Sequence, residues 1–335
     1  MVYHNNRRQF LKAAGSASVA SGFGLAGCVG LREGEFPDQE IAFLEPYGAG
    51  SGFDAYARGL ADVWEGYLDV DVVVENVTGA GGRTMVEQLY ADDSNGYTVG
   101  ILNIPGFAVA QEALDVSYDL SEMNHLGRVT RGTYNIYTAA DRDDIETWED
   151  LSEMDEVNFG MVGFGTSNSF VAILFLEEAD INVNWVTGYN EAPDVRRAVV
   201  QHEVDVAQHT VSAAGAMLQE GDLKPIMTYA ERDSLPDWYP DVPHTTPETE
   251  RFDGWEDRLN ISRIVSAPPD VDEDRVELLE ETLWETFQSD ELQEWADEAD
   301  QALTEQVRGD EAAEIIDGSM EEFRPHMDLI EPHIE

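Results

Sequence analysis

Short β-rich runs alternate with amphipathic helical segments along this chain from Glu40 onward. Strand-like runs lie at 69–76, 97–103, 133–140, 157–164, 181–189 and 263–269, and helical patterns lie at 53–68, 83–93, 169–179, 192–203 and after Val271. The helical segments are about 10–16 residues long, which suits crossovers between parallel strands. The alternation predicts an α/β fold with mostly parallel sheets flanked by helices.

Two segments with little helical pattern indicate passages between lobes. The first, 126–144, is extended in character, and the second, 237–270, is rich in proline and irregular before it becomes strand-like. Two crossings imply one lobe built from both ends of the chain and another built from its middle. We therefore predict lobe 1 at 40–131 and 262–335, lobe 2 at 132–261, and a ligand cleft between them.

The charge balance narrows the classes of partner. The chain has 335 residues with 19 Lys and Arg against 69 Asp and Glu, a formal net charge of −50. Such a chain has no basic surface for phosphates, so nucleic acid is not expected as a partner. The acids are spread through helices, and seven Trp, thirteen Phe and twelve Tyr supply an ordinary core. This pattern indicates a protein that stays soluble in high salt, from a halophile.

The N-terminal segment resembles an export signal. The run 6–12, NRRQFLK, is a twin-arginine pattern, and a small, apolar stretch follows it as far as a lipobox-like LAGC ending at Cys28. The apolar stretch is too short and too rich in Gly and Ser to form a good membrane-spanning helix. We expect a signal at 1–27, a tether at 28–39 and export to the outer face of the membrane. Removing the signal takes away three cations, so the mature net charge becomes −53.

Cys28 is the only cysteine of the chain. An intramolecular disulfide and a multi-thiolate metal site are therefore excluded. Its place at the end of the signal favours lipid attachment at Cys28 over an unmodified thiol, and a lipid chain would hold the protein at the membrane.

Familiar enzyme motifs are absent from the sequence. There is no P-loop, no dinucleotide fingerprint, no G-x-S-x-G elbow and no H-E-x-x-H. Phe53 occupies the place of the final glycine that a dinucleotide loop beginning at Gly48 would need. We expect no catalysed reaction, no cofactor and no metal.

Four loops rich in glycine and hydroxyl groups each precede a helical pattern, at 48–54, 78–83, 163–168 and 188–191. Ser51-x-x-Asp54 fits a capping box at the first of them. Helix N-termini with glycine approaches offer main-chain N–H donors and positive dipole ends to an anion. The alternative for the first loop is a plain tight turn. Arg83, the cation among these loops, contacts either a ligand or a surface acid.

These loops carry a family resemblance. The run 46–54, PYGAGSGFD, followed by Ala57-Arg58, resembles the P-[FY]-x-x-G-G-x-x-D…A-R signature of the tripartite tricarboxylate transporter receptors, the Bug or TctC type. The run 72–103 is similar to the family's block with VVEN, GAGG and DGYTL, and 186–210 and 223–248 resemble its later stretches. The matches follow the family's order from about Ile41 to Pro269.

The resemblance implies a two-lobed periplasmic-binding-protein type II fold that closes on a small organic carboxylate. Such a receptor delivers its ligand to membrane-embedded transporter subunits, and we expect it to act as a monomer. Two other functions stay open at this point. One is a binding protein for another transporter or a sensor on the same fold, and the other is an exported enzyme that uses the same cleft.

The resemblance also implies a binding site. The first two loops would hold a carboxylate through main-chain donors and bridging water, and the third loop would face them from the second lobe. Asp205 would bind a polar or amino group of the ligand, or hold a loop. Three residues depart from the family pattern: Glu45 replaces an apolar residue, Arg83 replaces an asparagine, and His202 replaces the glycine of the GEVD-like turn. The implied ligand-binding residues are Tyr47, Gly48, Ala49, Gly50, Ser51, Gly52, Phe53, Gly79, Ala80, Gly81, Gly82, Arg83, Thr166, Ser167, Asn168 and Asp205.

Overall fold

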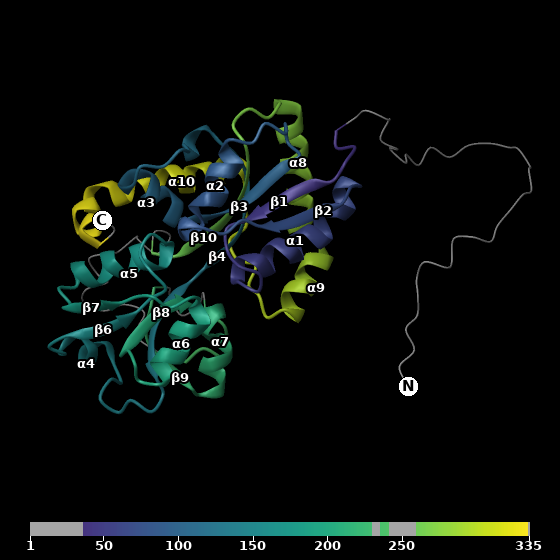
Figure 1. Ribbon diagram of the computed structural model, residues 1–335. Coiled ribbons are helices and arrows are strands. Elements are labelled where there is room, and N and C mark those ends of the chain that lie inside the picture. The colour runs from purple at the N-terminus through teal and green to yellow at the C-terminus, as the bar shows by residue number, and fades with distance from the viewer. Residues whose placement is uncertain (1–35, 230–234, 241–258, 334–335) are drawn as a thin grey trace, which may run out of the picture. The chain divides into compact units, whose positions relative to one another are not determined.

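The computed structural model describes residues 36–229, 235–240 and 259–333, which form two β-sheets flanked by helices (Figure 1). The predicted two-lobed α/β fold is confirmed. The twin-arginine segment and Cys28 lie outside the described residues.

The first lobe contains a six-stranded sheet in the order β11-β4-β10-β3-β1-β2. Its strands are β1 (Ile41–Glu45), β2 (Val72–Asn76), β3 (Thr98–Ile104), β4 (Asn124–Gly132), β10 (Ile261–Ala267) and β11 (Val307–Arg308). The second lobe contains a five-stranded sheet in the order β7-β6-β8-β5-β9. Its strands are β5 (Tyr134–Ala139), β6 (Val157–Gly160), β7 (Val183–Val186), β8 (Val206–Thr210) and β9 (Leu223–Thr228).

Both sheets are mixed, so the expectation of mostly parallel sheets was wrong. In the first sheet β1 is parallel to β2 and to β3, whereas β10 is antiparallel to β3 and β4, and β11 to β4. In the second sheet β6 is parallel to β7 and β8, and β5 is antiparallel to β8 and β9. Helical crossovers make the parallel pairs. Every antiparallel pair includes β4, β5 or β10, the strands that adjoin Thr133 and Asn260.

Helices flank both sheets. Those that follow strands of the first sheet are α1 (Gly52–Leu68), α2 (Arg83–Tyr90), α3 (Gly106–Ala113), α8 (Glu273–Phe287), α9 (Asp290–Glu298) and α10 (Gly309–Phe323). Those in the second lobe are α4 (Trp148–Ser152), α5 (Ser167–Glu178), α6 (Ala192–Val200) and α7 (Val211–Glu220). Shorter helices are η2 (Ala80–Gly82), η3 (Leu120–Glu122), η6 (Arg324–His326), α11 (Met327–Ile330) and η7 (Glu331–His333), and α11 contacts both α3 and α5.

The apolar spacing explains which helices are buried. In α1 the residues Phe53, Tyr56, Leu60 and Trp64 recur at three- or four-residue intervals and are at most 5% exposed, so one face packs on the first sheet. In α5 every residue from 170 to 176 is 0% exposed. A helix that is apolar all round is buried all round, and α5 contacts β8 of the second sheet as well as the helices α3 and α11.

The described ends of the two connections between the lobes lie close together. Only Thr133 separates the end of β4 from the start of β5. The Tyr134 main-chain N–H donates to the Asn260 side-chain oxygen at 3.0 Å, just before β10. The start of β5 is therefore tied to the residue that leads into β10.

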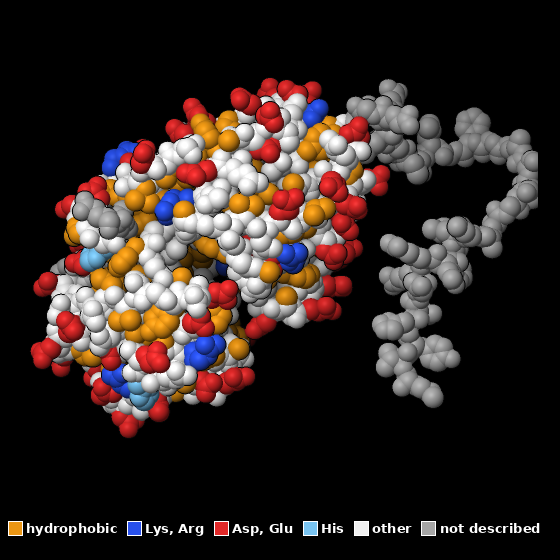
Figure 2. Space-filling view, in the orientation of Figure 1, with side chains coloured by type: hydrophobic (Ala, Val, Ile, Leu, Met, Phe, Trp, Pro, Cys, Tyr) orange, Lys and Arg blue, Asp and Glu red, His pale blue; other side chains and the backbone are white. Residues whose placement is uncertain are grey.

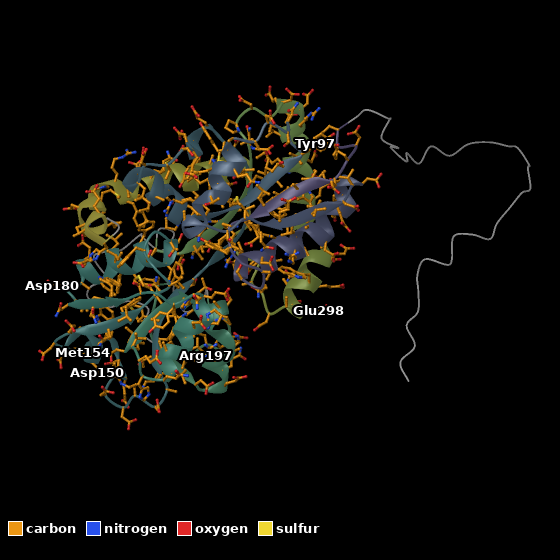
Figure 3. All side chains as sticks on the ribbon, viewed as in Figure 1. Tyr97, Asp150, Met154, Asp180, Arg197 and Glu298 are labelled. Atoms are coloured by element: carbon orange, nitrogen blue, oxygen red, sulfur yellow. The ribbon has the colours of Figure 1, made fainter. Side chains whose placement is uncertain are left out.

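Acidic side chains are spread over the visible face of the molecule (Figure 2). Asp180 and Glu298, labelled in Figure 3, are exposed examples from the two lobes. Among the Asp and Glu residues that the structure describes, Glu45 and Asp54 alone are buried.

Candidate functional site

A cavity of about 740 Å³ lies between the two sheets. The carboxyl ends of β1, β2 and β3 lead into it from one side, and those of β6, β7 and β8 from the other. Ligands of open α/β sheets bind at this end of parallel strands. The volume fits a small molecule.

Helix N-termini converge on the cavity. The N-cap residues of α1, α2, α5, α6 and α7 all line it: Ser51, Gly82, Thr166, Glu191 and Thr210. The side chains of Ser51, Thr166 and Thr210 accept hydrogen bonds from the main chain of their own first turns. The positive dipole ends of five helices therefore face one space, which favours an anion there.

The first loop is held by a reciprocal pair of hydrogen bonds. Ser51 Oγ accepts from the Asp54 N–H at 3.0 Å, and Asp54 Oδ2 accepts from the Gly50 N–H at 2.8 Å. The predicted capping box thus closes one residue earlier than its standard form, on Gly50. The main-chain N–H groups of Gly52 and Phe53 have no acceptor among the described residues and are available to a ligand.

Glu45 lies beneath this loop and is 0% exposed. Its carboxylate accepts from the Tyr47 N–H at 3.0 Å and from the Asn76 side chain, which also donates to Asp54 at 2.9 Å. Arg58 pairs with Asp54 at 2.8 Å. Burial raises the pKa of Glu45 to about 7. Glu45 is therefore a support of the loop and does not line the cavity.

The second loop depends on its glycines. Residues 79–82 all have positive φ, with Gly81 at 69° and Gly82 at 97°. A β-carbon at Gly82 would lie 2.9 Å from the Pro46 side chain, and one at Gly81 would lie 2.9 Å from the Gly165 carbonyl oxygen. The turn thus packs against the first loop and against the second lobe, and larger residues would not fit.

Twelve of the sixteen residues implied by the resemblance line the cavity. They are Tyr47, Gly48, Ala49, Gly50, Ser51, Gly52, Phe53, Gly79, Gly81, Gly82, Thr166 and Asn168. Ala80 does not line it. Arg83 does not line it either, and its guanidinium donates to the Gly165 carbonyl oxygen at 3.4 Å rather than to a surface acid.

Ser167 and Asp205 also lie outside the cavity lining. Ser167 is 0% exposed, and its hydroxyl accepts from the Gly106 N–H at 2.6 Å, which joins α5 to α3. Asp205 accepts from the Asn158 main chain at 2.9 Å and pairs with Arg142 at 2.9 Å. Of the two roles considered for Asp205, these contacts are those of a residue that holds a loop.

Sequence reasoning missed several cavity residues, among them Asn103, Tyr134, Arg196, His209 and Arg263. Burial, with a smaller contribution from the charge of Arg196, lowers the pKa of His209 to about 3, so its ring is neutral. The clearest overlooked signal was the single cation in the otherwise apolar and small strand ISRIVSA, 261–267.

A model of the tripartite tricarboxylate transporter family receptors matches residues 56–313. The chain belongs to this family. A UPF0065 protein from Cupriavidus necator is 24% identical to it over 244 residues, which are 71% of this chain and 73% of the relative.

Solved receptors share the fold. The periplasmic binding protein BugD superposes with a TM-score of 0.73 at 19% identity, covering 88% of this chain and 98% of BugD. MatC from Rhodopseudomonas palustris, with bound malate, gives a TM-score of 0.73 at 16% identity, covering 87% of this chain and all of MatC, 100%. None of the helices in the described part of the chain has the length and apolar character to span a bilayer.

Proposed function

We propose that this chain is an extracytoplasmic receptor that captures a small organic carboxylate and delivers it to the membrane subunits of a tripartite tricarboxylate-type transporter. The observation that carries the proposal is the convergence of five helix N-termini on one cavity between the lobes. An anion gains from the dipole ends and from unsatisfied N–H donors at short range. MatC, of the same fold, contains malate.

Main-chain donors suit so acidic a chain. A carboxylate that approaches a chain with a net charge of −50 is repelled by the field of the whole protein. Salt screens this repulsion at distances longer than the Debye length. Donors fixed in helix first turns act within hydrogen-bond distance, where screening matters little. This arrangement binds and releases a ligand without chemical change, so we propose a receptor without catalytic activity.

Ligand capture is proposed to close the two lobes. Residues from both line the cavity, and the paired crossings at Thr133 and Asn260 are the segments that would bend. A ligand that contacts both lobes stabilises the closed arrangement by the difference between its binding free energies for the closed and the open arrangements.

The N-terminal expectations complete the proposal. We propose export through the twin-arginine signal and lipid attachment at Cys28 in a halophilic source, with the receptor acting as a monomer. Mass spectrometry of the membrane fraction tests the anchor directly. A Cys28→Ala variant that stays membrane-bound would contradict it.

The function is tested by thermal unfolding of the full chain in KCl with mono-, di- and tricarboxylates. A saturable rise in melting temperature for at least one of them is expected, because a ligand that binds only the folded state stabilises it by mass action. Folded protein that responds to none of the carboxylates would overturn the proposal.

A further inference from the structure

Almost every cation that the structure describes has an anionic or main-chain partner. It describes twelve of the 19 Lys and Arg residues. Eight of the twelve form ion pairs, namely Arg58, Arg128, Arg131, Arg142, Arg197, Arg275, Arg308 and Arg324. Arg83 and Lys224 donate to main-chain carbonyl oxygens. Within the described residues, Arg196 and Arg263 have neither kind of partner, and both line the cavity.

Arg263 enters the cavity from the first lobe. It lies on β10 between Asn103 of β3 and Thr130 of β4, and it is 4% exposed. Its guanidinium carbon lies 4.8 Å from the centre of the Phe53 ring and 4.5 Å from that of Tyr56. Its buried Nε has no acceptor. Its terminal nitrogens also form no hydrogen bond with described residues.

The Arg263 guanidinium is next to the donors of the first loop. A β-carbon built at Gly52 would lie 3.5 Å from Arg263 Nη2. Gly52 carries one of the free N–H groups in the first turn of α1. A carboxylate at this point would meet a guanidinium fork and a helix N-terminus together.

Arg196 enters from the second lobe, on α6. Its Nη1 is buried and has no acceptor among the described residues. Its neighbours are the neutral His209 ring and Tyr137, whose hydroxyl is 2.6 Å from His209 Nδ1. Glu191 also lines the cavity, but its side chain is exposed and its carboxylate approaches Gly48, 3.7 Å from a β-carbon built there.

Arg263 is buried and Arg196 is half-buried with a buried Nη1, and neither has a counterion among the described residues. This arrangement is costly, because burial removes hydration from a cation and no acid of the described residues replaces it. The cost is conspicuous in a chain with 69 acids, where a partner would be easy to supply. Aromatic stacking does not replace a carboxylate here. Arg275 also stacks, 4.6 Å from the Phe36 ring centre, and it pairs with Asp272 as well.

We propose that Arg263 and Arg196 are specificity-determining residues that each bind one carboxylate of the same ligand, so that the receptor selects dicarboxylates over singly charged acids. This inference rests on the proposed function and deepens it. One carboxylate binds at Arg263 and the first turn of α1. The other binds at Arg196 beside His209, on the opposite lobe, so only a doubly charged ligand satisfies both cations when the lobes close.

Isothermal titration calorimetry tests the inference with the dicarboxylates from malonate to adipate, each compared with its own monoamide. The monoamide keeps the length and loses one charge. The wild-type chain is expected to prefer its best dicarboxylate by roughly 10–100-fold, the usual worth of a charge-assisted hydrogen-bonded contact. Arg263→Met and Arg196→Met are each expected to reduce this preference to less than about 3-fold.

Arg197→Met is the matched control. Arg197 adjoins Arg196 on α6, is 60% exposed, pairs with Asp194 and does not line the cavity; Figure 3 labels it. Its substitution should leave the preference unchanged. Without ligand, Arg263→Met should melt no lower than wild type, because it no longer buries an uncompensated charge.

The outcomes separate this inference from the receptor function. Equal binding of a dicarboxylate and its monoamide by wild type overturns the two-cation inference and leaves carboxylate capture standing. A preference for the dicarboxylate that survives either arginine substitution also overturns the two-cation inference. If Arg263→Met melts at a lower temperature than wild type and keeps the preference, Arg263 has a structural role and the inference is overturned. Failure of every mono-, di- and tricarboxylate to bind folded wild type overturns the receptor function itself.

Discussion

The Ser167 hydroxyl accepts a hydrogen bond from the Gly106 main-chain N–H at 2.6 Å, joining the first turns of α5 and α3 across the two lobes. The contact is close on every side. A β-carbon at Gly106 would lie 2.5 Å from Ser167 Oγ and 2.6 Å from the Ser167 main-chain nitrogen. Only glycine at this position allows the lobes to approach as they do.

Gly106→Ala should therefore weaken ligand binding. The added methyl group forces α3 and α5 apart, and overpacking of this kind costs about 1–3 kcal/mol. If this cost falls on the closed arrangement that binds the ligand, the affinity decreases by roughly 10-fold or more. Calorimetry with a bound carboxylate measures the loss. Gly66→Ala is the control, because Gly66 lies in α1 with no atom within 4 Å of the new β-carbon, and it should gain about 0.5–1 kcal/mol of stability. Unchanged ligand affinity in Gly106→Ala would show that the contact between Gly106 and Ser167 is not required for the lobes to close on a ligand.

Gly50→Ala should affect both the fold and the site. Gly50 has φ +85° with open space around it, so alanine adds backbone strain of about 1 kcal/mol without a clash. Gly221 at the end of α7 has φ +80°, equally open space and no place in the cavity lining, which makes Gly221→Ala a matched control. Both variants should lose similar stability in urea titration, and only Gly50→Ala should lose carboxylate affinity. Equal affinity in the two would remove the first loop from the site.

Glu45 should make the protein less stable as the pH rises. Its pKa is about 7 in the folded protein against 4.5 for the free group, so between these values the folded state holds a proton that the unfolded state has lost. Stability contributed by this group is present below pH 4.5 and decreases between about pH 4.5 and 7, by roughly 3 kcal/mol in all. Urea unfolding at a series of pH values should show a smaller decrease over this window in Glu45→Gln than in wild type. Identical pH profiles would place the folded-state pKa of Glu45 near its ordinary value.

Asp205→Asn should reduce stability and leave ligand affinity intact. The substitution weakens charge-assisted hydrogen bonds from Arg142 and from Asn158, which are worth about 1–3 kcal/mol when partly buried. Arg142 keeps Asp144 as a partner at 2.7 Å, so it is not left without a counterion. Thermal unfolding and calorimetry on one preparation measure both quantities. A loss of affinity at unchanged stability would return Asp205 to the binding site.

Local sequence signals located glycine-rich loops that line the cavity. Ser51 with Asp54 and Thr166 with Ser169 form caps at the starts of α1 and α5, because a side chain of this kind satisfies N–H groups only three residues away. The helix α3 was not predicted, since its N-cap is Pro105 and no side-chain cap marks its start. Neither α7 nor the strands β8 and β9 was predicted as an element.

The roles of individual side chains were less accessible from sequence. Ser167 and Asn168 are adjacent and similar, yet one joins α3 and the other faces the cavity. Successive residues of a helix point in different directions, and the neighbours that each one meets come from distant parts of the chain.

The sequence by itself determined the alternation of strands and helices, the glycine turns and the helix caps, because each depends on residues within one or two turns of chain. Only the tertiary structure decided that Arg263 and Arg196 lack counterions in the same cavity. Burial and ion pairing depend on groups that are far apart in sequence, and Arg263 lies against Phe53 and Tyr56 only because β10 and α1 pack together. A cation's place in the sequence does not reveal whether an acid or a ligand will face it.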